Sequence, residues 1–353
     1  MPNGFVINAR SLDRRLSGVE RYTSEVARRL GTQVRREAPG GNLPAGIGHF
    51  WEQVILPGKV RDGELLWSPA NTGPLAITNQ VLTLHDIHVL EHPEWFHPAF
   101  AAWYRWALPR LVRRVRRVLT VSEHSRKQIQ KYFSLPDDRV IAIAGGVDLA
   151  QFKPAPEAAI YQVRQRYGLI HDYVLFVGTI EPRKNLPWLL NTWRMVRTRF
   201  PRVDLAIAGD PVSHFTRALP VDSIGSRDLQ EGIHFLGYVA DSDLAALYSG
   251  AKILLLPSLT EGFGLTALEA MACGLPVIAS KSGALPETVG EGGWLVPPLN
   301  SSAWADAIYC LLANRDCWLD YQRRGLENAR RFSWDNTAAG VWQELEAARQ
   351  EGS

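Results

Sequence analysis

The chain has 353 residues, enough for two domains of ordinary size. Hydrophobic residues make up 46% of it and charged residues 21%, a composition that excludes an intrinsically disordered protein. The net charge of +3 is too small to indicate a nucleic-acid partner. The charge is uneven, however: residues 1–150 contain 20 Lys and Arg against 14 Asp and Glu, and the remaining residues contain 19 against 22. We therefore expect the basic first half and the acidic second half to contact different partners.

Cysteine usage and hydropathy indicate the compartment. The three cysteines, Cys273, Cys310 and Cys317, are an odd number without paired spacing, which argues against a disulfide framework or a zinc site. The first residues, MPNGFVINARSLDRR, contain no apolar stretch typical of a signal peptide. No run approaches the roughly 18 apolar residues that span a bilayer. We therefore expect a cytoplasmic protein.

Short apolar runs alternate with amphipathic segments, as in parallel sheets covered by helices on both faces. The runs predict strands at 5–9, 65–68, 81–84, 118–121, 140–144, 173–177, 203–208, 234–239, 253–257 and 277–280. Helical patterns occupy 18–30, 98–116, 123–133, 186–199, 241–250, 264–273, 301–313 and 334–349. This alternation predicts an α/β fold of doubly wound domains. It pauses at 145–156, where Gly and Pro residues suit a linker between two domains. Such domains would place a ligand at the carboxyl ends of their strands, in the cleft between them.

The most informative segment reads LLLPSLTEGFGLTALEAMACGLPVIAS, a strand, a glycine-containing loop, a helix and a second strand. Gly262 and Gly264 allow the backbone to approach a ligand closely. The amide groups at the start of the helix, near Leu265, offer an anion site that the helix dipole strengthens. This segment therefore predicts a phosphate site.

The same segment carries two glutamates. Glu261 lies on the loop, where it can bind sugar hydroxyls, and Glu269 lies inside the helix, where its carboxylate can accept two hydrogen bonds from a ribose diol. The alternative interpretation is that both are solvated surface residues. The setting of strand, Gly-x-Gly and helix start favours the ligand-binding interpretation.

A second strand, loop and helix, YVLFVGTIEPRKNLPWLL, carries Arg183 and Lys184 at the end of its strand. An Arg fork and a Lys ammonium side by side can bind a diphosphate, although an isolated pair of this kind is also typical of a solvated helix start. Both segments belong to the same half of the chain. We therefore expect the two cations and the glycine loop to converge on one anion.

These segments resemble the retaining glycosyltransferases of family 4, which have the GT-B architecture of two Rossmann-like domains. In the second half the resemblance rests on FVGTIEPRKNLPWLL, HFLGYVADSDLAALYSGAKILLLPSLTEGFGLTALEAMACGLPVIAS and GGWLVPP. In the first half it rests on INARSLDRRLSGVERYTSEVARRL, TLHDIHVLEHPEWF and TVSEHSRKQI. The domains it implies are 1–154 on the acceptor side, 155–333 for the nucleotide sugar, and a C-terminal helix over 334–353 that packs back toward the first domain.

The resemblance implies a role for each matching residue of the donor site. Glu269 would bind the donor ribose and Glu261 the donor sugar. Arg183 and Lys184 would neutralise the diphosphate. The backbone amides that would meet sugar and phosphate belong to Gly262, Phe263, Gly264 and Leu265.

Other matching positions border this site. Gly18 would lie near phosphate and acceptor, and His85 beside the transferred sugar. Tyr238 and Val239 end a strand where the family places the base. Many family members have Arg directly after the glycine that corresponds to Gly178, whereas this chain has Thr there, so we assign that charge to Arg183.

Two patterns imitate metal sites. Asp241-Ser242-Asp243 is formally a DxD motif, but it precedes a helical segment, so we expect Asp241 to cap that helix. His85, His88, His92 and His97 are spaced unlike any helical metal motif, and prolines interrupt them. We therefore expect no metal site and treat the last three histidines as surface or packing residues.

The segment Ala101–Val118 combines arginines with aromatic residues. A basic helix with aromatics is typical of proteins that bind an anionic membrane surface. The alternative is a solvated helix whose Trp residues pack in the core. A lipid-linked acceptor would favour the membrane.

The resemblance implies transfer of a hexose, with mannose expected first, from a nucleotide-diphosphate sugar to a saccharide acceptor, with retention of configuration and without a metal. GDP-mannose is the first donor expected, a UDP-sugar the second, and no cofactor is required. The acceptor, free or linked to a polyprenyl diphosphate, would belong to polysaccharide or O-antigen type assembly, and the enzyme would be cytoplasmic or peripheral on the inner face of the membrane. Two alternatives stay open: a nucleotide-sugar epimerase of GT-B fold, and a non-catalytic two-lobed protein that binds sugar or nucleotide.

Overall fold

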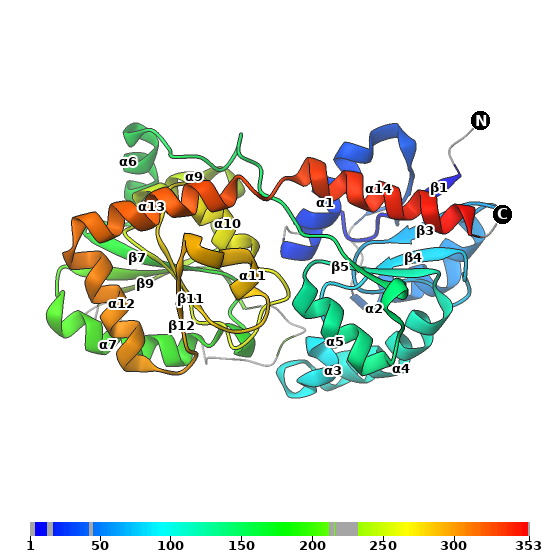
Figure 1. The fold of residues 1–353 in the computed structure, drawn as a ribbon, viewed down its shortest axis with the longest axis horizontal. Coiled ribbons are helices and arrows are strands. Elements are labelled where there is room, and N and C mark those ends of the chain that lie inside the picture. Colours follow the sequence, from blue (N-terminus) through cyan, green and yellow to red (C-terminus); the bar gives the residue numbers. More distant parts are fainter. Residues whose placement is uncertain (1–3, 13–16, 42–44, 212–214, 216–231, 352–353) are drawn as a thin grey trace. The chain divides into compact units, whose positions relative to one another are not determined.

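The computed structural model describes residues 4–12, 17–41, 45–211, 215 and 232–351. The chain divides into two compact units (Figure 1). Unit 1 comprises Met1–Pro93, Pro98–Gly146 and Ser333–Ser353, and unit 2 comprises Glu94–His97 and Val147–Phe332. The division at Gly146 and Val147 lies inside the 145–156 stretch, a few residues earlier than the expected boundary at 154/155.

Unit 1 is built on a parallel six-stranded sheet in the order β2-β1-β3-β4-β5-β6. Its strands are β1 (Phe5–Asn8), β2 (Arg35–Glu37), β3 (Leu65–Ser68), β4 (Gln80–Thr83), β5 (Arg117–Thr120) and β6 (Val140–Ala142). β1, β3 and β4 are buried throughout, as expected for central strands of a sheet covered on both faces. The edge strand β2 reads Arg-Arg-Glu, and this lack of apolar residues explains why hydropathy does not reveal it.

The helices of unit 1 are α1 (Gly18–Leu30), α2 (Ala45–Phe50), α3 (His88–Glu91), α4 (Pro98–Arg114), α5 (Glu123–Phe133) and α14 (Trp334–Gln350). α2 continues into a π-helical turn, Trp51–Ile55. α14 packs on α1 and β3, with the rings of Trp342 and Phe5 4.8 Å apart. The last helix of the chain therefore completes the unit that the first strand begins.

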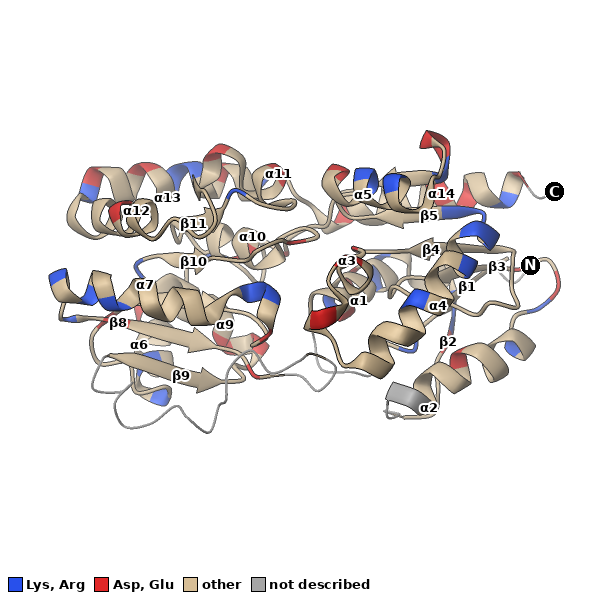
Figure 2. Cartoon of the chain, turned by 90° about the horizontal axis from the view of Figure 1, so that it is seen from below, with Lys and Arg blue, Asp and Glu red and all other residues tan. Residues whose placement is uncertain are grey.

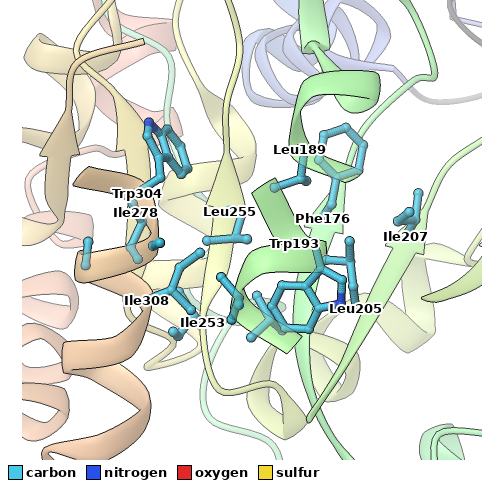
Figure 3. Close-up of a cluster of buried hydrophobic side chains, with 14 of the residues drawn as sticks. Phe176, Leu189, Trp193, Leu205, Ile207, Ile253, Leu255, Ile278, Trp304 and Ile308 are labelled. Carbon is cyan, nitrogen blue, oxygen red and sulfur yellow. The ribbon is translucent and has the colours of Figure 1, made fainter. Parts of the chain in front are cut away.

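Unit 2 has a second parallel sheet, in the order β12-β11-β10-β7-β8-β9. Its strands are β7 (Asp172–Val177), β8 (Val203–Ala208), β9 (Ile233–Gly237), β10 (Leu254–Leu256), β11 (Val277–Ser280) and β12 (Trp294–Val296). Its helices are α6 (Glu157–Arg166), α7 (Leu186–Arg199), α9 (Asp241–Gly250), α10 (Leu265–Ala272), α11 (Leu285–Val289), α12 (Ser301–Ala313) and α13 (Arg315–Ala329). Figure 3 shows Trp193 of α7, Leu255 of β10 and Ile308 of α12 in one buried cluster.

The strand order reverses once in each sheet. In unit 1 the reversal lies between β1 and β3: β2 is added on the outer side of β1, and β4 to β6 are added on the outer side of β3. In unit 2 it lies between β7 and β10, with β8 and β9 added beyond β7 and with β11 and β12 added beyond β10. Open α/β sheets bind ligands at the carboxyl ends of the two strands that flank such a reversal. Both units therefore have one position at which a ligand site is expected. Among the described helices, none is long and apolar enough to cross a bilayer.

Candidate active site

The switch point of unit 2 brings together the two loops that the sequence singled out. After β7 the chain forms a short 3₁₀ turn, Pro182–Lys184, and enters α7 through Asn185, whose φ is 57°. After β10 the loop reaches α10 through Gly264, whose φ is 113°. The backbone N–H of Leu259 donates to the carbonyl of Arg183 at 2.8 Å, which joins the two loops directly.

Glu261 lies at the centre of this region and is only 7% exposed. Lys184 Nζ donates to Glu261 Oε1 at 2.6 Å, and Ser258 Oγ donates to the same oxygen at 2.7 Å. The other oxygen, Oε2, accepts from the guanidinium of Arg183. The same guanidinium donates to the carbonyl of Thr260 at 3.1 Å and to the buried carboxylate of Glu181. The predicted cations and the predicted sugar-binding glutamate therefore form one ion-pair cluster.

Electrostatics within the cluster hold Glu261 ionised. Burial alone would raise the pKa of its carboxyl, but the charges of Arg183 and Lys184 outweigh burial and lower that pKa to about 2. Lys184 has three N–H donors, and one of them donates to Glu261. Its ammonium group and the Arg183 guanidinium, which flank the one carboxylate of Glu261, present positive charge to an anion that arrives beside the cluster.

Glycines shape the cluster. A Cβ on Gly178 would lie 3.2 Å from Lys184 Cε, so the absence of a side chain there leaves room for the lysine. A Cβ on Gly283, just after β11, would lie 2.4 Å from the backbone nitrogen of Glu261. Next to Gly283, the N–H of Ala284 donates to the carbonyl of Glu261 at 2.9 Å. Sequence reasoning missed Gly283, although a glycine close to the end of a predicted strand was an available signal.

The start of α10 carries the predicted amide groups. Gly262 and Phe263 are buried, whereas Leu265, the first residue of the helix, is partly exposed. The ring of Phe263 packs against Phe332 at 5.8 Å, and its carbonyl accepts from Thr288 Oγ1 at 2.7 Å. These contacts of Phe263 hold the loop in place. The backbone N–H groups at the start of α10 can then meet a ligand.

Two further parts of the predicted donor site are Glu269, inside α10, and the residues that follow β9. Glu269 is 7% exposed, and its Oε2 accepts from the Tyr248 hydroxyl at 3.0 Å, so α9 orients this carboxylate. After β9, Tyr238 is 44% exposed, whereas the side chain of Val239 is buried. Tyr238 is therefore the side chain of this pair that a ligand can reach from solvent.

His85 and Gly18 belong to unit 1. His85 Nε2 lies 2.9 Å from the carbonyl of Pro69, and since a carbonyl only accepts, Nε2 carries the proton and leaves Nδ1 as an acceptor in the neutral ring. Burial is the largest influence on the His85 pKa and lowers it, which favours this neutral form. The Tyr22 ring lies nearly perpendicular to the imidazole, with the two ring centroids 4.8 Å apart. Gly18 is exposed and begins α1.

The aspartates of the DxD pattern stabilise the fold, but the expected cap is wrong. Ala240, with an extended backbone, occupies the cap position, and Asp241 and Asp243 both lie in the first turn of α9. Asp243 accepts from Arg166 at 2.5 Å and from the Tyr167 hydroxyl at 3.1 Å. Among the residues that the structure describes, no three His, Cys, Asp or Glu side chains are grouped to hold a metal ion.

The arginine-rich segment divides into two parts. Arg117 pairs with Glu344 and Glu351, and Arg116 donates to the carbonyl of Ala348 at 2.6 Å, so these two fasten the C-terminal region to β5. The exposed arginines of α4, which Figure 2 shows in blue, are Arg105, Arg110, Arg113 and Arg114. Only part of the predicted basic surface therefore faces solvent.

Comparison with known proteins places these two units in a family. Residues 171–314 match the family described as Glycosyl transferases group 1, and residues 65–151 match Glycosyltransferase Family 4. The O-antigen chain mannosyltransferase B of Escherichia coli is 35% identical over 273 residues, which are 74% of this chain and 69% of that protein. The D-inositol 3-phosphate glycosyltransferase of Corynebacterium glutamicum (strain R) is 32% identical, and the match covers 63% of this chain and 55% of the relative.

Solved structures show the same architecture. Sucrose-phosphate synthase from Thermosynechococcus elongatus has a TM-score of 0.76 at 21% identity, covering 98% of this chain and 99% of that one. Anabaena Alr3699/HepE, solved in complex with UDP-glucose, has a TM-score of 0.75 at 20% identity, with 97% and 99% covered. The chain therefore has the GT-B fold and belongs to the glycosyltransferases of family 4.

Proposed function

We propose that the protein transfers a hexose, with mannose as the first expectation, from a nucleotide-diphosphate sugar to a saccharide acceptor in O-antigen type assembly. The observation that carries the proposal is the cluster of Arg183, Lys184 and Glu261 at the switch point of unit 2. GDP-mannose is the donor to test first, since a mannosyltransferase is 35% identical to this chain. A UDP-sugar is the second, since Anabaena Alr3699/HepE was solved with UDP-glucose.

The chemistry we propose is electrostatic and retains the anomeric configuration. As the glycosidic bond breaks, negative charge grows on the leaving diphosphate, and the positive charges of Arg183 and Lys184 together with the amides near Leu265 stabilise it. The acceptor hydroxyl attacks from the face that the diphosphate leaves, and the diphosphate takes its proton. Because these groups supply the positive charge, the proposal needs no resident metal. Glu261 orients the cations and meets the sugar, and Glu269 binds the ribose.

Nucleotide sugars and two substitutions test this assignment. Thermal unfolding with GDP-, UDP- and ADP-sugars should identify the donor, because a ligand stabilises the native state in proportion to the logarithm of its concentration over Kd. Lys184→Ala should lower transferase activity by about a hundredfold or more, as the removal of one charge-stabilising group does elsewhere. Glu269→Ala should chiefly weaken donor binding. Near-full activity in both variants would contradict the proposed donor site.

The same reactions distinguish the two alternatives. A donor incubated without acceptor should stay unchanged, and an isomerised sugar would indicate an epimerase. Stabilisation by a nucleotide sugar without any release of nucleoside diphosphate in the presence of saccharide acceptors would indicate a binding protein.

We further propose that unit 1 binds an anionic membrane surface, which suits an acceptor carried on a polyprenyl diphosphate. The exposed arginines of α4 support this proposal. Beside α4, where the rings of Trp103 and His49 lie 5.6 Å apart, the neighbouring helical segment exposes Ile47, Phe50 and Val54 at helical spacing. Basic and apolar side chains combined in this way are typical of interfacial segments.

A further inference from the structure

The switch point of unit 1 contains a buried ion pair that the mechanism above does not use. Glu52, on the π-helical turn, is 0% exposed. Its Oε1 accepts from Asn8 Nδ2 at 2.7 Å and from Arg10 Nε at 3.3 Å, and its Oε2 accepts from Thr72 Oγ1 at 2.6 Å. Both carboxylate oxygens are therefore engaged by neighbouring groups.

The elements that supply these residues flank the reversal of the sheet. Asn8 ends β1, Arg10 follows it, and Thr72 lies on the segment after β3. This is the position in unit 1 that corresponds to the Glu261 cluster in unit 2, where a buried glutamate also orients a basic side chain. Burial would raise the pKa of Glu52, but Arg10 and His49 outweigh burial and lower it to about 2, so Glu52 is a fixed negative charge.

Two buried donors, on Arg10 and the residue after it, have no hydrogen-bond partner within the described part of the chain. Arg10 is 7% exposed and Ser11 is 4% exposed. Among the described residues, none offers a hydrogen-bond partner to Arg10 Nη1 or Ser11 Oγ. A buried donor left unpaired destabilises the fold, and more strongly when the group is charged. Arg10 donates to Glu52 through Nε, and this bond fixes the orientation of the guanidinium. Its Nη1 group is then the donor that can bind a ligand.

We propose that Arg10 and Ser11, oriented by Glu52, form an anion site on unit 1 that binds a phosphate or carboxylate group of the acceptor. A guanidinium donates in a planar fork and accepts nothing, which matches an oxyanion. The hydroxyl of Ser11, the next residue along the chain, adds a neutral donor. One part of this proposal rests on the proposed function, namely that the anion belongs to the acceptor.

The test measures anion binding apart from glycosyl transfer. In the full chain carrying Lys184→Ala, which weakens the anion site of unit 2, inorganic phosphate and acetate are titrated by calorimetry at constant ionic strength. We expect a remaining site for at least one of them, and we expect Arg10→Ala to weaken it about tenfold or more, the effect of losing a charge-assisted hydrogen bond. The matched control is Arg28→Ala, which removes an arginine of unit 1 whose side chain is 60% exposed. It should leave the affinity unchanged.

A second variant separates binding from folding. Glu52→Gln keeps the shape of the side chain but removes its negative charge. It should therefore raise the affinity for the anion, whereas Arg10→Ala should lower it. A purely structural role for the pair predicts that both variants lose stability and that neither changes anion affinity in a folded chain. That result, or the absence of any anion site in the Lys184→Ala chain, would overturn the proposal.

The source of the anion is then distinguished with the acceptor. A preference for phosphate over acetate indicates a diphosphate-linked acceptor, and the reverse indicates an acidic sugar. Arg10→Lys keeps the charge and loses the fork, so it should raise the KM for such an acceptor while the KM for the donor stays constant. An unchanged acceptor KM would overturn the acceptor assignment and leave the anion site standing. A chain that binds anions but transfers no sugar would contradict the proposed function alone.

Discussion

At the scale of single residues, the ionised carboxyl of Glu261 links stability to pH. Its pKa is about 2 in the folded chain against an ordinary value of 4.5, because the nearby cations outweigh the effect of burial. The folded state therefore binds this proton less readily than the unfolded state, and the resulting stabilisation is present above the ordinary pKa and lost as the pH falls toward the folded one.

We expect this one group to contribute about 3 kcal/mol at neutral pH, of which about 2 kcal/mol is lost between about pH 6 and about pH 3. Urea unfolding at several pH values measures the loss. In Glu261→Gln the free energy of unfolding should fall less steeply over the same range. An identical pH dependence in the parent chain and the variant would show that Glu261 is not held ionised as described.

Residue types and their distance from strand ends were sufficient to predict Arg183, Lys184 and Glu261 as site residues. Their mutual pairing was not predictable, because it depends on β7 and β10 being neighbours in the sheet, and about 80 residues of chain separate the two strands. Glu52 escaped prediction for the same reason, since its partners Asn8 and Thr72 lie on other elements.

At the scale of elements, burial explains which helices the sequence revealed. α1, α7 and α12 bury five residues each and show clear apolar stripes. α6 buries Val163 alone, and α13 buries Gly325, Asn328 and Ala329, so neither has an apolar stripe to detect. The central strands were predicted within a few residues, whereas the edge strands β2 and β12 were missed because they are short and only partly buried.

The packing of α14 on unit 1 gives a prediction at this scale. Leu345 is fully buried on the face of α14 that meets the unit, so Leu345→Ala should lower the free energy of unfolding by about 2–5 kcal/mol through lost burial and the cavity left behind. Thermal unfolding followed by circular dichroism measures the change. Glu346→Ala, at the exposed neighbouring position, should leave stability nearly unchanged. Equal effects of the two substitutions would mean that α14 does not pack through this face.

At the scale of the whole molecule, the charge asymmetry between the halves has a structural basis. The acidic half neutralises its cations locally, as Glu261 does with Arg183 and Lys184. The basic half uses Arg117 in ion pairs with Glu344 of α14 and with Glu351 but leaves the arginines of α4 exposed. The excess positive charge is therefore available on one helix.

Flotation with liposomes tests whether this charge binds a membrane. The full chain should bind vesicles that contain anionic phosphatidylglycerol at low salt and bind them less at high salt. Replacing Arg105, Arg110, Arg113 and Arg114 by Gln should weaken binding by about 1 kcal/mol for each charge. The control is Arg323→Gln with Arg324→Gln, two exposed arginines on α13 of unit 2. Equal flotation of both variants, or no flotation of the parent chain at any salt, would contradict membrane binding.

The place of α14 in unit 1 also determines which unit receives its last segment last during synthesis. Unit 2 has all its residues once Phe332 has been synthesised, whereas unit 1 still lacks the segment that begins at Ser333. Domains generally fold as units while the chain is being made. The half that is translated second is thus the first whose residues are all present in the growing chain. Until α14 has been synthesised and has left the ribosome, the faces of α1 and β3 that α14 covers stay open to chaperones and to aggregation.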